Sequence, residues 1–149
     1  MRVVLDASVI LKWLLADPGR ERDTERATVL VQAVVAGELE ILQPFHWLAE
    51  VAAVLARLSP ETATDDALML SAMEIPTTDE AQVLGRACTL AIDMHHHVFD
   101  TLYHAVALEN SNTMLITADD NYCKKAQALG RIQALREWVP VHVTPDCGL

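Results

Sequence analysis

Arg2-Val3-Val4-Leu5-Asp6-Ala7-Ser8-Val9, residues 2–9, is the segment that decides the fold class. Its first half is a continuous apolar run, which is typical of a short strand buried on both faces of a parallel sheet. Its second half places Asp-Ala-Ser before a further apolar stretch, which is typical of the start of a helix. A buried strand that leads directly into a helix is the building unit of α/β domains.

The same alternation of strand and helix continues along the chain. Further strands are predicted at four short apolar runs: 40–42, 75–77, 113–117 and 139–144. Longer helical patterns separate them, and no Asn-Gly hairpin signal lies between apolar runs. We therefore predict one α/β domain over residues 1–149, with about five parallel strands, helices on both faces and a loose tail from about residue 145.

Composition limits the classes of protein that the chain can represent. The sequence is 52% hydrophobic and carries a net charge of −10, which argues against a general nucleic-acid coat because phosphate backbones require clustered Lys and Arg. Its three cysteines are scattered, so neither a disulfide framework nor a zinc ribbon is expected. No apolar run approaches the roughly 20 residues of a membrane span. We predict a soluble cytoplasmic protein with no membrane partner.

Four acidic residues stand alone in otherwise apolar stretches. They are Asp6 in VVLD, Glu50 in WLAEVAAVLA, Asp100 in VFDTLYHAVAL and Asp119 after MLITA. Helix capping would explain Asp6 or Asp119 taken singly. It does not explain Glu50, because that helix is apolar nearly all round and a buried carboxylate is costly without a partner. A protein that gathers several such acids usually holds a metal or performs acid–base chemistry.

The joint pattern of the four acids favours a metal site. Oxygen-only ligands suit hard cations such as Mg²⁺ or Mn²⁺, and four carboxylates in one pocket would repel one another without one or two such ions. A cation held this way can bind a phosphate oxygen, activate water and stabilise the leaving oxygen. Phosphodiester hydrolysis is therefore the predicted reaction class.

The histidines allow other interpretations. Three consecutive residues do not share a helix face, so His95–His97 is interpreted as a polar helix end rather than a transition-metal site. His104 lies one turn after Asp100, where it is either a packed side chain or a contact to the substrate; both alternatives remain open. The sequence contains no Gly-rich phosphate loop, no GxSxG and no notable Cys–His arrangement.

Four segments of the chain resemble a known family. LDASVILKWLL, PFHWLAEVAAVL, VFDTLYHAVALE and LITADDNYCKKA together resemble the PIN-domain ribonucleases, and in particular the VapC-like toxins of toxin–antitoxin pairs. The resemblance covers about residues 2–144. It implies a parallel sheet with an acidic pocket at the carboxyl ends of its strands, and cleavage of RNA with Mg²⁺ or Mn²⁺. It also implies a homodimer that a small antitoxin protein holds inactive.

The resemblance carries specific residues over to this sequence. The metal-binding and catalytic acids would be Asp6, Glu50, Asp100 and Asp119. Residues that help to arrange the pocket would be Ser8, Thr117 and Asp120. Candidates for contacts to the RNA backbone are Lys12, Lys124 and Lys125. The chain departs from the family pattern at the His95–His97 run, at His104 and at Thr101, and none of these changes removes an acid.

Two other functions are weighed against this one. The first is a catalytically silent PIN-like module that binds RNA or protein, although a purely structural role would not require four retained acids. The second is a phosphatase or phospho-acceptor domain built around Asp6. An aspartyl phosphatase would need a second Asp where this chain has Ser8, so the phosphatase is disfavoured.

Overall fold

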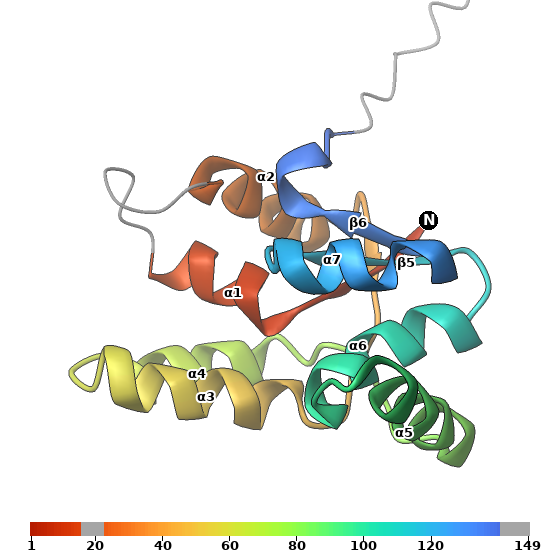
Figure 1. Cartoon of the computed structure of the whole chain (residues 1–149). Coiled ribbons are helices and arrows are strands. Elements are labelled where there is room, and N and C mark those ends of the chain that lie inside the picture. The colour runs from red at the N-terminus through yellow and green to blue at the C-terminus, as the bar shows by residue number, and fades with distance from the viewer. Residues whose placement is uncertain (16–22, 141–149) are drawn as a thin grey trace, which may run out of the picture.

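A four-stranded parallel sheet forms the centre of the molecule (Figure 1). In order across the sheet, its strands are β2 (Glu40–Ile41), β1 (Arg2–Leu5), β5 (Thr113–Thr117) and β6 (Ile132–Ala134). The structure is a computed structural model in which residues 1–15 and 23–140 are described. The predicted α/β fold with a parallel sheet is confirmed.

Helices flank this sheet. They are α1 (Ala7–Leu14), α2 (Thr24–Val35), α3 (Trp47–Leu58), α4 (Ala63–Ala72), α5 (Ala81–Met94), α6 (Val98–Glu109) and α7 (Asp120–Ala126), with short 3₁₀ helices η1 (Gln127–Leu129) and η2 (Leu135–Glu137). In Figure 1, α2 lies above the sheet, and α3, α4, α5 and α6 lie below it. α6 packs directly on β1 and β5, and α5 packs on α6. Within the described ranges, no helix is both long enough and apolar enough to cross a bilayer.

The sheet differs in detail from the sequence-based prediction. β3 (Gln43–Pro44) and β4 (Thr77–Thr78) form a separate two-stranded parallel pair, so the strand expected at 75–77 does not join the main sheet. β6 was not predicted, because Ile-Gln-Ala is too short and too mixed to give an apolar run. Val139 and Pro140 lie outside any strand, and residues 141–144 and the expected tail lie outside the described residues.

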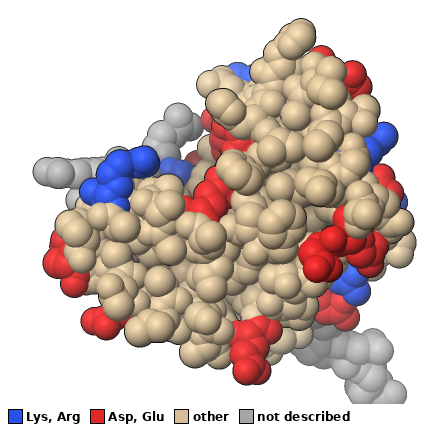
Figure 2. Space-filling view, turned by 90° about the horizontal axis from the view of Figure 1, so that it is seen from below, with Lys and Arg blue, Asp and Glu red and all other residues tan. Residues whose placement is uncertain are grey.

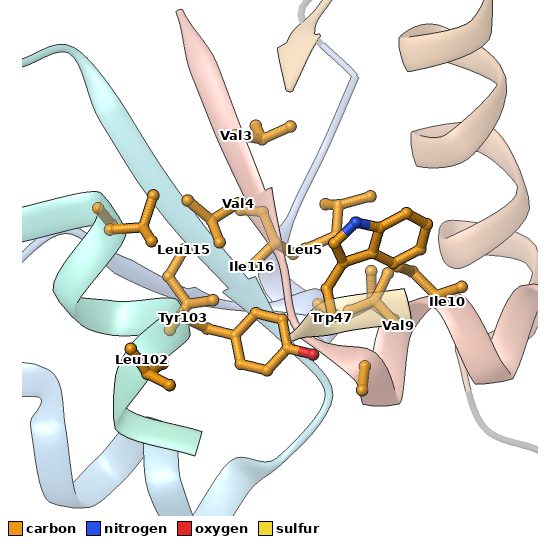
Figure 3. Close-up of a cluster of buried hydrophobic side chains, with 14 of the residues drawn as sticks. Val3, Val4, Leu5, Val9, Ile10, Trp47, Leu102, Tyr103, Leu115 and Ile116 are labelled. Atoms are coloured by element: carbon orange, nitrogen blue, oxygen red, sulfur yellow. The ribbon is translucent and has the colours of Figure 1, made fainter. Parts of the chain in front are cut away.

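The core explains why the first strand is apolar throughout. Side chains of Val3–Leu5 are at most 2% exposed although they alternate between the two faces of the sheet. They pack with Leu115 and Ile116 of β5 and with Tyr103 and Trp47 from the helices below (Figure 3). A strand covered on both faces cannot carry a polar side chain without a partner, so the first polar position falls where the strand ends.

A buried glutamine replaces missing backbone pairing at the end of β1. Gln43 is fully buried, and its Oε1 accepts from the backbone amide of Leu5 over 2.9 Å. Its Nε2 donates to the carbonyl oxygen of the same residue over 2.8 Å. The side-chain amide thus pairs with Leu5 as a neighbouring strand would, in the position directly before Asp6.

Replacing Gln43 with leucine is expected to lower the free energy of unfolding by roughly 2–4 kcal/mol, because a buried N–H and a buried C=O would lose their partners. Urea denaturation of the metal-free protein measures this change. Gln32 on α2 is exposed, so Gln32→Leu is the control and should change stability by less than about 0.5 kcal/mol. Equal stability of the two variants would show that the Leu5 backbone does not depend on this amide.

Candidate active site

Asp6 and Thr117 meet because their strands are neighbours in register. β1 and β5 pair with Leu5 opposite Ile116, so the residues that follow these two positions lie at the same edge of the sheet. The backbone amide of Asp6 also donates to the carbonyl oxygen of Ile116 over 3.0 Å. This edge, at the carboxyl ends of the strands, is where open α/β sheets bind ligands.

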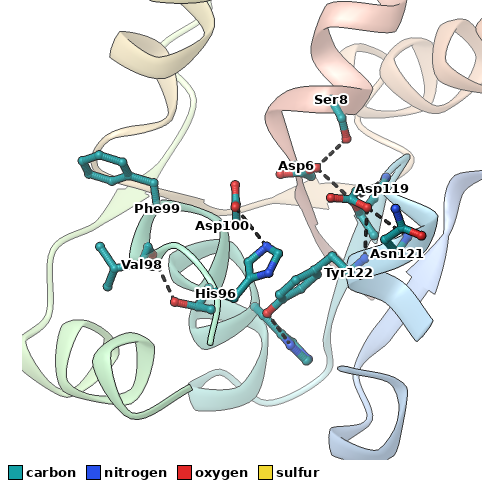
Figure 4. A network of polar contacts seen from close by, with 12 residues as sticks. Asp6, Ser8, His96, Val98, Phe99, Asp100, Asp119, Asn121 and Tyr122 are labelled. Atoms are coloured by element: carbon teal, nitrogen blue, oxygen red, sulfur yellow. Dashed lines mark hydrogen bonds and ion pairs between the residues drawn. The ribbon is translucent and has the colours of Figure 1, made fainter. Parts of the chain in front are cut away.

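Two hydroxyl groups hold the Asp6 carboxylate by one oxygen (Figure 4). Ser8 Oγ donates to Asp6 Oδ2, and Thr117 Oγ1 donates to the same oxygen over 2.9 Å. The backbone amide of Ala118 donates to Ser8 Oγ over 3.1 Å, and that of Asp119 donates to Thr117 Oγ1 over 3.0 Å. Each hydroxyl therefore accepts an amide and directs its single proton at Asp6. This arrangement leaves Oδ1 of Asp6 for a ligand in the pocket.

Asp100 stands in the first turn of α6 beside a histidine (Figure 4). His96 Nε2 lies 3.0 Å from Asp100 Oδ2. The contact is an ion-pair distance without the alignment of a hydrogen bond, and the buried Nε2 has no hydrogen-bond partner among the described residues. His95–His97 form the turn between α5 and α6, as predicted for a polar helix end. His96, the middle residue, nevertheless faces Asp100.

Glu50 is held from two sides. The hydroxyl of Tyr103 donates to Glu50 Oε2 over 2.5 Å, and His46 Nε2 lies 3.4 Å from the same oxygen. Burial and the charge of Glu50 raise the pKa of Tyr103, so the tyrosine keeps its proton and acts as the donor. The partner that this acid needs in an apolar helix is therefore a buried tyrosine from α6.

Asp119 and Asp120 have different surroundings. Asp119 is exposed and caps α7, because its Oδ1 accepts from the backbone amides of Asn121 over 2.9 Å and of Tyr122 over 3.0 Å. Asp119 therefore caps α7 and lines the acidic pocket at the same time. Asp120 instead pairs with Arg136 and does not line the pocket.

Three of the four candidate acids line a small cavity of about 10 Å³, which is room for one water molecule or ion; Glu50 is not among its lining residues. The cavity is lined by Asp6, Asp100, Leu115, Thr117, Asp119 and Tyr122. A much larger cavity, about 430 Å³, lies between the N-terminus, α2 and Trp138, but none of the four candidate acids lines it. We therefore assign the chemistry to the small acidic pocket.

The donor set fits a divalent cation in its chemistry. The carboxylate oxygens of the pocket suit Mg²⁺ or Mn²⁺. His96 Nε2, at ion-pair distance from Asp100 but without a hydrogen-bond partner among the described residues, is a further candidate ligand atom. Across residues 1–15 and 23–140, however, no three His, Cys, Asp or Glu side chains already form a compact coordination group. The side chains would have to draw together around an ion.

Mutual repulsion and burial oppose ionisation in the pocket. Burial raises the pKa of Asp6 from 3.8 to about 6; hydrogen bonds from Ser8 and Thr117 lower it, and the charges of Glu50 and Asp100 raise it. Burial also raises the pKa of Asp100, against the lowering effect of His96. A cation in the pocket would offset both burial and repulsion.

The raised pKa of Asp6 predicts how stability depends on pH. In the folded protein this carboxyl takes up a proton near pH 6, whereas in the unfolded chain it stays ionised down to about pH 4. The folded state thus binds more protons than the unfolded chain in this window. The contribution of Asp6 to the free energy of unfolding of the metal-free protein should therefore rise by about 1 kcal/mol as the pH falls from 7 to 5. Comparing denaturation of the wild type and Asp6→Asn at both pH values isolates this contribution. If the difference in free energy of unfolding between the wild type and Asp6→Asn is the same at both pH values, the raised pKa of Asp6 is contradicted.

His104 supports the wall of the pocket. It is fully buried; its Nε2 lies 2.8 Å from the carbonyl oxygen of Gly130, and its Nδ1 lies 3.2 Å from the hydroxyl of Tyr122. The carbonyl accepts only, so Nε2 carries the proton and Nδ1 accepts from the tyrosine. Burial lowers the pKa of His104 and keeps the ring neutral. Of the two alternatives, the packed side chain is the one observed.

The three candidate lysines lie away from the pocket. Lys12 is in the last turn of α1, and Lys124 and Lys125 are in the last turn of α7. None of the three is among the residues that line the acidic cavity.

Sequence reasoning missed His46, Tyr103, Tyr122 and Gln43. Three of them carried a usable signal. His46 precedes Glu50 by four residues and Tyr103 follows Asp100 by three, so each shares a helix face with an acid. Tyr122 follows Asp119 by the same three residues, and its backbone amide donates to that acid. Gln43 reaches the site through a contact that is distant in sequence, and no local spacing indicates it.

Fold and site together define an α/β domain with a carboxylate pocket suited to phosphoryl chemistry. Comparison with protein families finds the PIN domain over residues 3–128, and the chain belongs to the PIN-domain family. PIN domains are in general nucleases that use divalent metal ions. No curated protein sequence is significantly similar to this chain.

Proposed function

We propose that this chain is a metal-dependent endoribonuclease that hydrolyses RNA phosphodiester bonds. The observation that carries the proposal is the gathering of Asp6, Asp100 and Asp119 around one cavity, with Glu50 close enough to raise the pKa of the first two. The oxygen donors favour one or two Mg²⁺ or Mn²⁺ ions as the cofactor. Such an ion, when bound, supplies charge to the phosphate and activates water.

The protein groups have distinct roles in this proposal. Asp6 and Asp100 are the main ligands, and Asp119 adds the oxygen that does not cap α7. Glu50 of α3, oriented by the Tyr103 hydroxyl, adds negative charge that acts on Asp6 and Asp100 from outside the lining of the cavity. Ser8 and Thr117 fix the carboxylate of Asp6, so that little reorganisation is needed on binding.

A binding module without catalysis is the alternative. Binding RNA through carboxylates would be unfavourable, since both partners are anionic. The hydroxyl pair that fixes one oxygen of Asp6 is also more than a passive binding surface requires. These observations favour hydrolysis.

We further propose that the protein is the toxin of a toxin–antitoxin pair and acts as a homodimer. Exposed aliphatic side chains on α3 and α4 support a covering partner: Leu58 is 60% exposed, Leu68 64% and Met69 43%. The face seen in Figure 2, below the sheet of Figure 1, is largely uncharged. Light scattering of the purified chain tests the dimer. Growth arrest on expression, relieved by a small protein encoded beside it, tests the toxin role.

Cleavage of a mixed cellular RNA pool tests the nuclease. Purified, partner-free protein should give discrete fragments with Mg²⁺ or Mn²⁺, none with EDTA, and none with the Asp100→Asn variant. Equal cleavage by wild type and variant would expose a contaminating nuclease. Tight RNA binding without cleavage by the wild type would favour the silent module.

A further inference from the structure

The two phenylalanines are the exposed aromatic side chains of the described chain. Phe45 is 52% exposed and Phe99 is 57% exposed. The other aromatic residues are buried or partly buried: Trp13, Trp47, Tyr103, Tyr122 and Trp138. Every other large apolar side chain that is exposed in residues 1–15 and 23–140 is aliphatic. Among the Phe, Trp and Tyr side chains of residues 1–15 and 23–140, exposure is thus limited to these two positions.

Both phenylalanines lie next to site acids. Phe99 directly precedes Asp100, and the two side chains project from the same first turn of α6 (Figure 4). Phe45 lies just before α3, the helix whose first turn carries Glu50. Both rings contact His46, whose Nε2 lies 3.4 Å from Glu50 Oε2. The two rings, far apart in sequence, are therefore linked to this acid through one histidine.

His46 connects the two rings into one surface. Its ring stacks on Phe99 with centroids 5.3 Å apart and planes 22° apart. It meets Phe45 edge to face, with centroids 5.8 Å apart. We call the three residues Phe45, His46 and Phe99 the aromatic platform. Because His46 is 92% buried, the platform is exposed only through its phenylalanines.

One backbone hydrogen bond and one side-chain contact to the backbone hold the segments that carry the platform. The amide of Phe45 donates to the carbonyl oxygen of Thr78 over 3.1 Å. The carbonyl oxygen of Phe99 lies 3.0 Å from His46 Nε2. Rings held in this way lose little conformational entropy when a ligand packs on them.

Electrostatics alone gives this site little affinity for RNA. The chain has a net charge of −10, its pocket is lined with carboxylates, and the candidate lysines lie at the far ends of α1 and α7. Stacking of a base on an aromatic side chain needs no positive charge and contributes roughly 1–3 kcal/mol per base. An aromatic surface beside the acids can therefore supply binding that phosphate contacts cannot.

We propose that Phe45 and Phe99 stack against unpaired bases next to the scissile phosphate, so that the site selects single-stranded RNA. In a duplex the base faces are covered by neighbouring bases, and only a strand with splayed bases presents them to a protein. The aliphatic side chains exposed elsewhere suit a protein contact, whereas Phe99 is next to Asp100 in the first turn of α6 and Phe45 lies just before α3, whose first turn carries Glu50. This inference rests on the proposed ribonuclease function.

Binding to an unstructured RNA oligonucleotide tests the proposal in an Asp6→Asn background, which prevents cleavage and leaves both phenylalanines in place. Phe45→Leu and Phe99→Leu should each weaken binding roughly five- to hundredfold in fluorescence anisotropy. Phe45→Tyr and Phe99→Tyr, which retain a ring, should bind like the parent. A 2-aminopurine base in the oligonucleotide should be quenched by the parent and less by the leucine variants. Ile92→Ala, an exposed aliphatic position on α5, is the matched control.

The outcomes separate this inference from the ribonuclease proposal. Unchanged RNA binding by both leucine variants, while the wild type still cleaves RNA with metal, would overturn the stacking role alone. So would equal binding of the oligonucleotide and its annealed duplex. Unchanged RNA binding with a shift in oligomeric mass would assign the platform to a protein contact. If the wild type neither binds nor cleaves RNA, the ribonuclease proposal itself fails.

Discussion

Replacing Asp6 with asparagine is expected to reduce RNA hydrolysis by roughly a thousandfold or more, because a metal ion in such a site contributes several kcal/mol to the transition state. The amide oxygen of asparagine can still accept from Ser8 and Thr117, which now hold Oδ2 of the carboxylate. The fold and the local hydrogen bonds should therefore survive. What is lost is the charge that draws a cation into the pocket.

The same substitution should stabilise the metal-free protein. The pKa of Asp6 is raised to about 6, which means that the folded state opposes ionisation of this carboxyl. Removing the charge should increase the free energy of unfolding at pH 7 by roughly 1–3 kcal/mol. Stabilisation by Mn²⁺ or Mg²⁺ should shrink at the same time, since the variant binds the ion less tightly.

Initial rates of RNA cleavage, together with urea denaturation with and without metal, measure both effects. Asp93→Asn on the exposed side of α5 is the control and should leave activity and metal response unchanged. An Asp6→Asn protein that is destabilised, yet responds to metal as the wild type does, would make Asp6 a structural residue.

Removing the two hydroxyl donors should weaken metal binding without removing any acid. Thr117→Val and Ser8→Ala each take away one of the two hydrogen bonds to Asp6 Oδ2, so that a single hydroxyl is left to orient the carboxylate. Groups that orient a metal ligand typically contribute 10- to 100-fold to affinity or activity, and about this loss is expected for each variant. The pKa of Asp6 should rise further, because both hydroxyls lower it.

Calorimetric titration with Mn²⁺ gives the dissociation constant for these variants. Thr117→Ser keeps the hydroxyl and should stay within about threefold of the wild type, which corresponds to about 0.6 kcal/mol. Thr89→Val on exposed α5 removes a threonine hydroxyl that has no contact with the site. If Thr117→Val and Ser8→Ala bind Mn²⁺ as tightly as Thr89→Val, the hydroxyl pair does not orient the ligand.

The strongest local patterns predicted the fold and the position of the acids. Residues 2–5 and 113–117 were predicted to be buried strands because both are mainly apolar. In the structure they pair with each other at the centre of the sheet. Asp6 and Asp119 could be placed near one another because the carboxyl ends of parallel strands share one edge. The order of the four acids along these elements matched the PIN-domain pattern, and membership of the chain in that family is confirmed.

Contacts between distant segments were not predictable in the same way. β6 and the β3–β4 pair are only two or three residues long, so pairing with a neighbour rather than a local pattern defines them. Asp120 looked equivalent to Asp119 in the sequence, yet a one-residue step around the helix start turns it toward Arg136.

The sequence by itself determined an α/β domain with two acids at strand ends and two in apolar helices, since apolar runs must be buried and an isolated charge among them needs a partner. Only the tertiary structure decided how those acids are held: Tyr103 from α6 on Glu50 of α3, Thr117 of β5 on Asp6 of β1, and His96 beside Asp100. It also decided that two phenylalanines share one exposed surface through His46. Hydrogen bonds and ring contacts act over a few ångströms in space, and distance along the chain does not determine which side chains come that close.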